Sequence, residues 1–314
     1  MSNEIELKFE INDSDIAALQ LYLNQWAHSD ELEFSAISNQ KRTFSQLTLC
    51  NTYYDTVDYY LRHHGCGLRV RTSNDSTITH FEITLKRDKK TIAGLHERAE
   101  FNADLPNSEP DLTVLPYSAL PDNCDIERLQ QDLLPLFSTD FKRQVWLISF
   151  ASSEIEIALD QGEIHSNGKI KIIQEVELEI KQGNKQDLLN FALELSRFNL
   201  HLFSQSKAAR GYRLLKNAPL KICQFDPQVH QDLVQLLKFW QQNEEYALEV
   251  NDLELYQQTL NQINYILIDK YLPLEPEFTQ WQMALSSINS VKEFAFSEIN
   301  TKLKLILIAN LTVN

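Results

Sequence analysis

The sequence predicts an α+β protein in which a strand-rich, antiparallel part precedes an all-helical part. Apolar and polar residues alternate with a period of two over about eight segments, as they do in half-buried strands. These segments follow one another with few helices between them, which favours a meandering antiparallel sheet. From about residue 225 onward the apolar residues recur instead at helical spacing. We therefore expect a β-sandwich or a closed β-barrel, followed by helices.

The first elements follow from local patterns. Residues 4–11 alternate apolar and charged side chains, which predicts a strand. Residues 12–26 open with Asn and Asp and then show helical apolar spacing, which predicts a helix. Residues 30–45 are polar and irregular, and we expect a mobile loop. Further strands are expected at 47–56, 65–71 and 77–87, the last one bounded by a turn at 87–90.

The next elements complete the strand-rich part. They are, in order, a strand at 92–101, an insertion over 103–140 with a helix at 125–137, strands at 140–150 and 153–164 joined by a tight turn at 151–153, a long strand at 168–183 between two glycines, and helices at 184–200 and 204–215. Residues 216–227 are the expected junction with the helical part.

Composition limits the classes of function. A formal net charge of -15 argues against non-specific binding to nucleic acid, although a small basic pocket remains compatible with it. The apolar stretches are too short or too interrupted to cross a bilayer, and the first strand starts so near Met1 that we expect no signal peptide. The four cysteines have neither zinc-site nor disulfide spacing. These features predict a reduced, cytoplasmic protein that binds neither nucleic acid nor a membrane.

The polar faces of the predicted strands carry charges of both signs. Acids occupy successive same-face positions on several strands, where they repel one another unless something positive compensates. Carboxylates without thiol or paired His ligands suit a hard cation such as Mg²⁺ or Mn²⁺, whereas Arg and Lys suit phosphate oxygens. The pattern slightly favours metal-assisted phosphoryl chemistry inside a barrel over an ordinary charged exterior.

A series of short motifs then appears in order: EIELKF, YYDT, LRVR, TLK, RAE, EIALDQGEI, EVELEI and SKAARGY. Together they resemble the CYTH family, the triphosphate tunnel metalloenzymes, over about residues 3–216. The likeness is especially close to bacterial inorganic triphosphatases that carry a C-terminal CHAD-like helical domain. It implies an eight-stranded antiparallel β-barrel that forms a tunnel over residues 1–218, with a helical domain over 219–314.

The resemblance also implies a reaction and the residues that perform it. The reaction is metal-dependent hydrolysis of inorganic tripolyphosphate to pyrophosphate and phosphate. The residues that would bind the triphosphate are Lys8, Arg69, Arg71, Lys86, Arg98, Arg143, Lys207 and Arg210. Those that would bind Mg²⁺ or Mn²⁺ are Glu4, Glu6, Glu175, Glu177 and Glu179. The acids that would orient a metal-bound water are Glu100, Glu156 and Asp160.

Two other functions stay open, and so does the role of the helices. The alternatives are hydrolysis or cyclisation of an organic triphosphate, as in thiamine triphosphatase or class IV adenylyl cyclase, and a non-catalytic polyphosphate- or nucleotide-binding module. Many acids facing the bases argue against a pure anion binder. The helical segment is short for a CHAD domain, is acidic and has a single histidine, His230. We expect it to pack on the barrel or to form a homodimer, the other possibility being a loosely ordered remnant. We also expect Tyr53 and Tyr54 to be packing residues and His80 and His96 to be ordinary strand residues.

Overall fold

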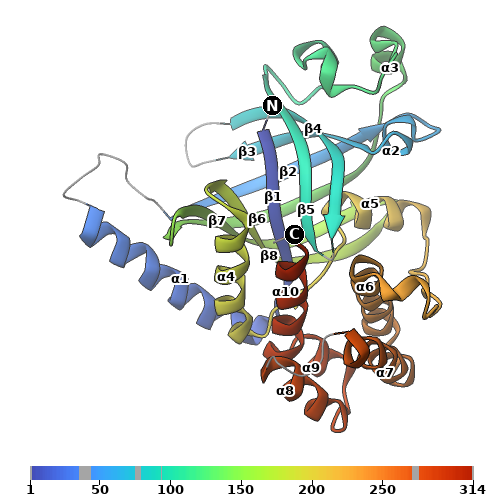
Figure 1. Cartoon of the computed structure of the whole chain (residues 1–314). Coiled ribbons are helices and arrows are strands. Elements are labelled where there is room, and N and C mark those ends of the chain that lie inside the picture. The colour runs from blue at the N-terminus through green and yellow to red at the C-terminus, as the bar shows by residue number, and fades with distance from the viewer. Residues whose placement is uncertain (1, 35–43, 75–78, 93, 271–275, 313–314) are drawn as a thin grey trace.

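The computed structural model describes residues 2–34, 44–74, 79–92, 94–270 and 276–312. Its first two thirds form a β-barrel with flanking helices, and the rest is helical (Figure 1). The strands are β1 (Ser2–Glu10), β2 (Ser45–Asp55), β3 (Cys66–Asn74), β4 (Thr79–Ile92), β5 (Leu95–Leu105), β6 (Leu134–Phe150), β7 (Ser153–Ser166), β8 (Lys169–Gln182) and β9 (His201–Leu202).

The helices flank the barrel or follow it. The α-helices are α1 (Asp13–Phe34), α2 (Tyr60–His63), α3 (Ile126–Asp132), α4 (Lys185–Leu195), α5 (Lys207–Lys216), α6 (Leu233–Val250), α7 (Leu253–Lys270), α8 (Pro276–Leu285), α9 (Val291–Ala295) and α10 (Glu298–Thr312). Short 3₁₀ turns are η1 (Leu112–Val114), η2 (Tyr117–Ala119), η3 (Ser196–Phe198) and η4 (Val229–Gln231). None of these described helices is long and apolar enough to cross a membrane.

The sheet closes on itself. Its strands pair antiparallel in the order β5-β4-β3-β2-β6-β7-β8-β1, and β1 also pairs with β5. The very short β9 lies beside the end of β1, where Phe9 is opposite Leu202 and Glu10 is opposite His201. The choice between a sandwich and a barrel is therefore settled, and the expected eight-stranded antiparallel barrel is confirmed.

Alternation along β1 places its charged side chains inside the barrel. Leu7 and Phe9 are fully buried on the outer face, in one core with residues of α1 and α4 such as Leu19 and Phe191. The polar face is also hidden from solvent, because Glu6 is only 3% exposed. A solvated strand would leave this face open to water, so the closed barrel explains the burial of both faces.

Several boundaries differ from the sequence prediction, and three of them change an expected element. The turn expected at 87–90 is wrong, since β4 continues to Ile92 with a register shift between Asp88 and Lys90, and Gly94 takes the positive φ of 92°. The helix expected at 125–137 ends at Asp132, and β6 begins at Leu134, because Pro135 disfavours helix at the residue before it. The loop expected at 30–45 is helical through Phe34, and residues 35–43 lie outside the described part of the chain.

The helical segment packs on the barrel. Helices α6 and α7 lie side by side, and α10 packs against α4 (Figure 1). One core contains Phe191 and Leu202 of the barrel part together with Trp240, Trp281 and Leu307 of the helices. The described helices are thus a packed layer and not a loosely ordered remnant, while a domain boundary at residue 218 stays a prediction.

Candidate active site

The barrel encloses a cavity of about 670 Å³ whose lining is mostly charged. The predicted site residues that line it are Glu4, Lys8, Arg69, Arg71, Lys86, Arg98, Glu100, Arg143, Glu156, Glu177, Glu179 and Lys207. Glu6, Asp160 and Glu175 lie just behind this lining, each bonded to one of its cations. Arg210 is the exception, because it lies beyond Glu175 and lines a separate cavity.

Strand register brings the acids of three strands together. Between β1 and β8, Glu6 lies opposite Glu179 and Lys8 lies opposite Glu177. Between β7 and β8, Glu156 lies opposite Glu179 and Asp160 lies opposite Glu175. Like charges that face one another across strands destabilise a sheet, so these carboxylates need cations beside them.

One half of the acidic wall is already neutralised by the protein. Asp160, Glu175 and Glu177 form a cluster whose ligand atoms all lie within 4.8 Å of one another. The Lys207 ammonium stands among them, 2.6 Å from Asp160 and 3.1 Å from Glu177, and it also pairs with Glu175. Arg143 donates to Asp160 at 2.7 and 2.6 Å and to Glu177 at 2.6 Å. Burial alone would favour the protonated acid, but Lys207, Lys8 and Arg143 hold the pKa of Glu177 well below its usual range.

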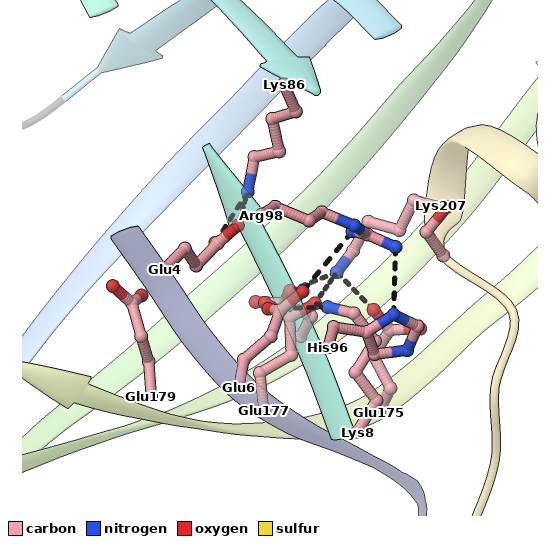
Figure 2. Close-up of polar contacts among 12 residues, drawn as sticks. Glu4, Glu6, Lys8, Lys86, His96, Arg98, Glu175, Glu177, Glu179 and Lys207 are labelled. Carbon is pink, nitrogen blue, oxygen red and sulfur yellow. Dashed lines mark hydrogen bonds and ion pairs between the residues drawn. The ribbon is translucent and has the colours of Figure 1, made fainter. Parts of the chain in front are cut away.

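The other half of the acidic wall is less well compensated. Glu4 accepts from Lys86 at 2.6 and 2.8 Å, and Lys181 lies 2.9 Å from Glu179 and 3.4 Å from Glu156. Burial, with the charges of Glu4 and Glu156, raises the pKa of Glu179 to about 7 despite Lys181. Figure 2 shows Glu179 on the side of the tunnel that holds Glu4, apart from the contacts around Lys207. A further positive charge beside this carboxylate would lower its pKa and favour the ionised form.

On the basic wall of the cavity, positive charges lie close to one another. Burial and the charges of Arg69 and Arg143 lower the pKa of Arg71 to about 9, so that it stays charged near neutral pH but at a cost. Its Nε donates to Asn51 at 2.8 Å, which fixes the guanidinium. Arginines that crowd one another in a buried cavity are stabilised by an anion.

Helix α5 carries Lys207 into the site, and its motif explains how. The Ser206 hydroxyl accepts from Ala209 N at 3.1 Å and caps the helix. A Cβ on Gly211 would lie 2.0 Å from the Phe137 ring, so only glycine allows this approach to β6. The Tyr212 hydroxyl donates to Asp55 at 2.8 Å.

Asp55 is the acid of the YYDT motif and holds two elements at once. It is fully buried and accepts from the backbone N–H groups of Leu61 and Arg62 at 2.8 and 3.0 Å, as well as from Tyr212. It thereby fixes α2 and α5 at the mouth of the cavity. The bonds of Asp55 thus connect the end of β2 to both helices.

Several lining residues were missed by the sequence reading: Tyr53, Arg62, Glu82, Asn102, Lys181 and Tyr212. Lys181 continues the same-face series of Glu175, Glu177 and Glu179, so alternation could have found it. Tyr53 was expected only to pack; it stacks on Phe137 at 4.7 Å and also lines the cavity. His96 is buried beside Arg98, 3.0 Å from its guanidinium, and burial and that charge lower its pKa to about 3.

The fold and the lining define a class of protein: a closed antiparallel β-barrel whose interior is divided between facing acids and bases. Residues 2–212 match the family described as the CYTH domain, and the chain belongs to this family. The family resemblance seen in the motifs is thus confirmed. The match ends before the helical segment, whose likeness to a CHAD domain stays a prediction.

Individual relatives add detail. An inorganic triphosphatase of Haemophilus influenzae is 37% identical over 220 residues, which are 68% of this chain and 55% of that protein. The chain therefore spans about half the length of that curated relative. Among solved structures, the Hippeastrum protein HpAC1, described as a proposed adenylyl cyclase with a dominant triphosphatase activity, is 17% identical with a TM-score of 0.45, covering 67% of this chain and 95% of that one. The PH1819 protein of Pyrococcus horikoshii is 17% identical with a TM-score of 0.40, covering 68% and 98%.

Proposed function

We propose that the protein hydrolyses inorganic tripolyphosphate to pyrophosphate and phosphate inside its barrel, with Mg²⁺ or Mn²⁺. The observation that carries this proposal is the paired crowding of charge across one cavity. Burial together with the neighbouring acids raises the pKa of Glu179 to about 7, and burial together with the neighbouring arginines lowers that of Arg71 to about 9. A polyanion bound together with a divalent cation relieves both. The inorganic triphosphatase activity of the Haemophilus influenzae relative supports the same assignment.

The donor set fits a hard divalent cation. The acids on the less compensated wall offer carboxylate oxygens alone, which Mg²⁺ and Mn²⁺ prefer. We assign Glu4 and Glu179 as the principal ligands, with Glu6 and Glu177 beside them on the same strands. Glu175 is a poorer candidate, because Lys207 and Arg210 already neutralise it. When bound, the cation would neutralise phosphate charge and lower the pKa of an attacking water.

The protein's own side chains supply the rest of the chemistry. Arg69, Arg71 and Arg143 face the cavity from β3 and β6 and would bind the phosphoryl oxygens as negative charge moves onto the leaving group. Lys8, Lys86 and Arg98 would bind the remaining phosphates, with Lys86 leaving Glu4 to do so. Glu156, opposite Glu179, would accept the proton of the water, and Glu100 would orient Lys86, 3.7 Å away. Asp160 would act by holding Arg143 and Lys207 in place.

The lining favours an inorganic triphosphate over one that carries a base. Among the described residues, each aromatic ring that lines the cavity is already covered on one side. Tyr53 stacks on Phe137, Tyr212 lies under Arg62 at 4.2 Å, and Phe141 lies under Lys207 at 5.0 Å. A nucleobase or thiazole ring would therefore find at most one face of each of these rings on which to stack.

The test is phosphate release from tripolyphosphate with Mg²⁺, with Mn²⁺ and with EDTA, beside ATP and thiamine triphosphate. We expect metal-dependent release from tripolyphosphate that greatly exceeds release from the organic substrates. Glu179→Gln is expected to weaken Mn²⁺ binding in calorimetry by at least about tenfold, because the loss of a residue that only orients a metal ligand already costs about that much. Glu175→Gln, four residues along the same strand, is the matched control and should keep Mn²⁺ affinity while lowering stability. Tight tripolyphosphate binding without release would point instead to a binding module. A homodimer formed through the helical segment is a separate proposal, which sedimentation would test.

A further inference from the structure

A buried carboxylate in the helical segment is connected to the catalytic strand β1. Glu244 of α6 is fully buried and accepts from Tyr256 OH at 2.6 Å, Asn300 Nδ2 at 2.9 Å and Trp240 Nε1 at 3.3 Å. It also pairs with Lys304 of α10. A buried charge is costly unless it is paired and hydrogen-bonded, so these helices are arranged around Glu244.

The partner of Glu244 on the barrel side is His201 of β9. This imidazole is fully buried, with Nε2 2.9 Å from Glu244 and Nδ1 3.1 Å from Glu10 of β1. Because both ring nitrogens face a carboxylate oxygen, both must carry a proton, which makes the ring an imidazolium. Burial opposes that charge, but the bonds to Glu10 and Glu244 raise the pKa of His201 to about 9.

Glu10 belongs to the same polar face of β1 as Glu4, Glu6 and Lys8, but it does not line the barrel cavity. It lines a second cavity of about 390 Å³, between the barrel and the helical segment, together with Lys171 and Arg210. In register it lies directly opposite Glu175, whose own partners are Arg210 and Lys207. Glu10 has His201 as its hydrogen-bond partner, and the charge of Arg210 also acts on it, so both carboxylates draw on the same guanidinium.

We propose that Glu244 is a positioning residue for the barrel site: it keeps His201 charged, His201 neutralises Glu10, and Arg210 and Lys207 are thereby left on Glu175. The backbone supports the same connection, because Phe203 N, two residues from His201, donates to the carbonyl of Lys8 at 3.1 Å. The helical segment is then part of the catalytic unit and not a separate module. This inference rests on the proposed function and names residues outside the cavity that it depends on.

The prediction concerns pH. His201 faces two carboxylates, Glu10 and Glu244. On the barrel side, the charges near Glu10 are those of Lys171 and Arg210. On the helical side, the groups near Glu244 are Lys304 and Tyr256. Without Glu244, one carboxylate alone supports the buried imidazolium, and the pKa of His201 falls. Glu10 then becomes uncompensated as pH rises, and it draws Arg210 from Glu175.

The experiment uses the full chain with Glu244→Gln and Lys304→Met together, so that no buried ammonium is left unpaired. The KM for tripolyphosphate and the kcat are measured at pH 6, 7 and 8, and the His201 ring nitrogens are titrated by ¹⁵N NMR. We expect KM near the wild-type value at pH 6 and about tenfold higher at pH 8, because Glu175 without Arg210 would hold Lys207 more tightly and weaken its contact with phosphate. Adding Glu10→Gln should restore KM at pH 8. Exposed Glu254→Gln of α7 is the control and should change nothing.

A folded double variant whose KM does not vary with pH more than that of the wild type, or whose defect Glu10→Gln fails to restore, overturns the proposal. If the double variant does not fold, His201→Gln with and without Glu10→Gln asks the same question. Calorimetric binding of tripolyphosphate in EDTA gives the same pH comparison without turnover, so a failure of the proposed hydrolysis is told apart from a failure of this inference.

Discussion

Replacing Gly211 by alanine tests whether the close packing of α5 against Phe137 of β6 determines the position of Lys207 in the site. The new Cβ would lie 2.0 Å from Phe137 Cε2, with two other ring carbons at 2.3 and 2.6 Å. Since carbon atoms in contact lie about 3.5 Å apart, the helix or the ring must move by roughly 1.5 Å. The ring has little freedom, because Tyr53 stacks on it and Tyr212 meets its edge. The helix must therefore shift and carry Lys207 with it.

A misplacement of about 1 Å in a catalytic group can cost about 100-fold in rate, and overpacking costs about 1–3 kcal/mol of stability. We expect both losses in Gly211→Ala, measured as phosphate release from tripolyphosphate and as the free energy of unfolding in urea. Gly168→Ala is the control, because Gly168 has open space around its missing Cβ and a φ of +74°. It should cost about 1 kcal/mol through backbone strain but keep the rate. A folded Gly211→Ala protein with wild-type turnover would refute the account of α5.

Other predictions concern stability. The pKa of Glu179 is raised from 4.5 to about 7, so its ionisation disfavours the folded state. In EDTA, the unfolding free energy of the wild type should therefore fall between pH 5 and 7 relative to that of Glu179→Gln, by up to about 3 kcal/mol. If the unfolding free energies from urea curves show the same pH dependence in the two proteins, this prediction is wrong. Asp55→Asn leaves the donors of α2 and α5 short of an acceptor and should cost about 1–3 kcal/mol in thermal unfolding; a change below about 0.5 kcal/mol would sink the idea. A chain ending at Ala218 exposes the core shared with α6 and should aggregate in gel filtration, whereas a folded, active fragment would support an independent barrel domain.

The strands that carry the site could be predicted because a closed barrel keeps the period of two. Glu4, Glu6 and Lys8 alternate with Leu7 and Phe9, and the structure places these two sets on opposite faces. Alternation alone cannot tell a tunnel from solvent, since both accept charged side chains. What decides is closure through the pairing of β5 with β1, a contact between segments about ninety residues apart that no local pattern encodes.

The contacts that were missed are long-range or depend on one backbone angle. The pairing of Lys207 with Asp160 joins α5 to β7, and the bond from Tyr212 to Asp55 joins α5 to the end of β2. The turn after β4 was misplaced because a charged run resembles a loop, whereas strand pairing continues until Gly94 supplies a positive φ. Glu244 lies in a stretch that the sequence shows only as acidic, whereas in the structure it is fully buried between Tyr256 of α7 and Lys304 of α10.

The two ends of the acidic series on β8 differ in what surrounds them, and this difference organises the site. Glu175 pairs with Lys207 and Arg210, so cations of the protein itself neutralise its charge. These buried ion pairs also hold α5 against the barrel. Glu179 pairs with the ammonium of Lys181, but burial and the nearby charges of Glu4 and Glu156 raise its pKa. Additional positive charge would therefore be needed to favour its ionised form. In the function proposed above, a strand with identical acids at alternate positions would serve as a structural anchor at one end and as a cation site at the other. The cations that hold Glu175 come from α5. In the inference proposed above, the helical segment keeps Glu10 from competing for them, and binding strength in the barrel would then depend on residues well outside it.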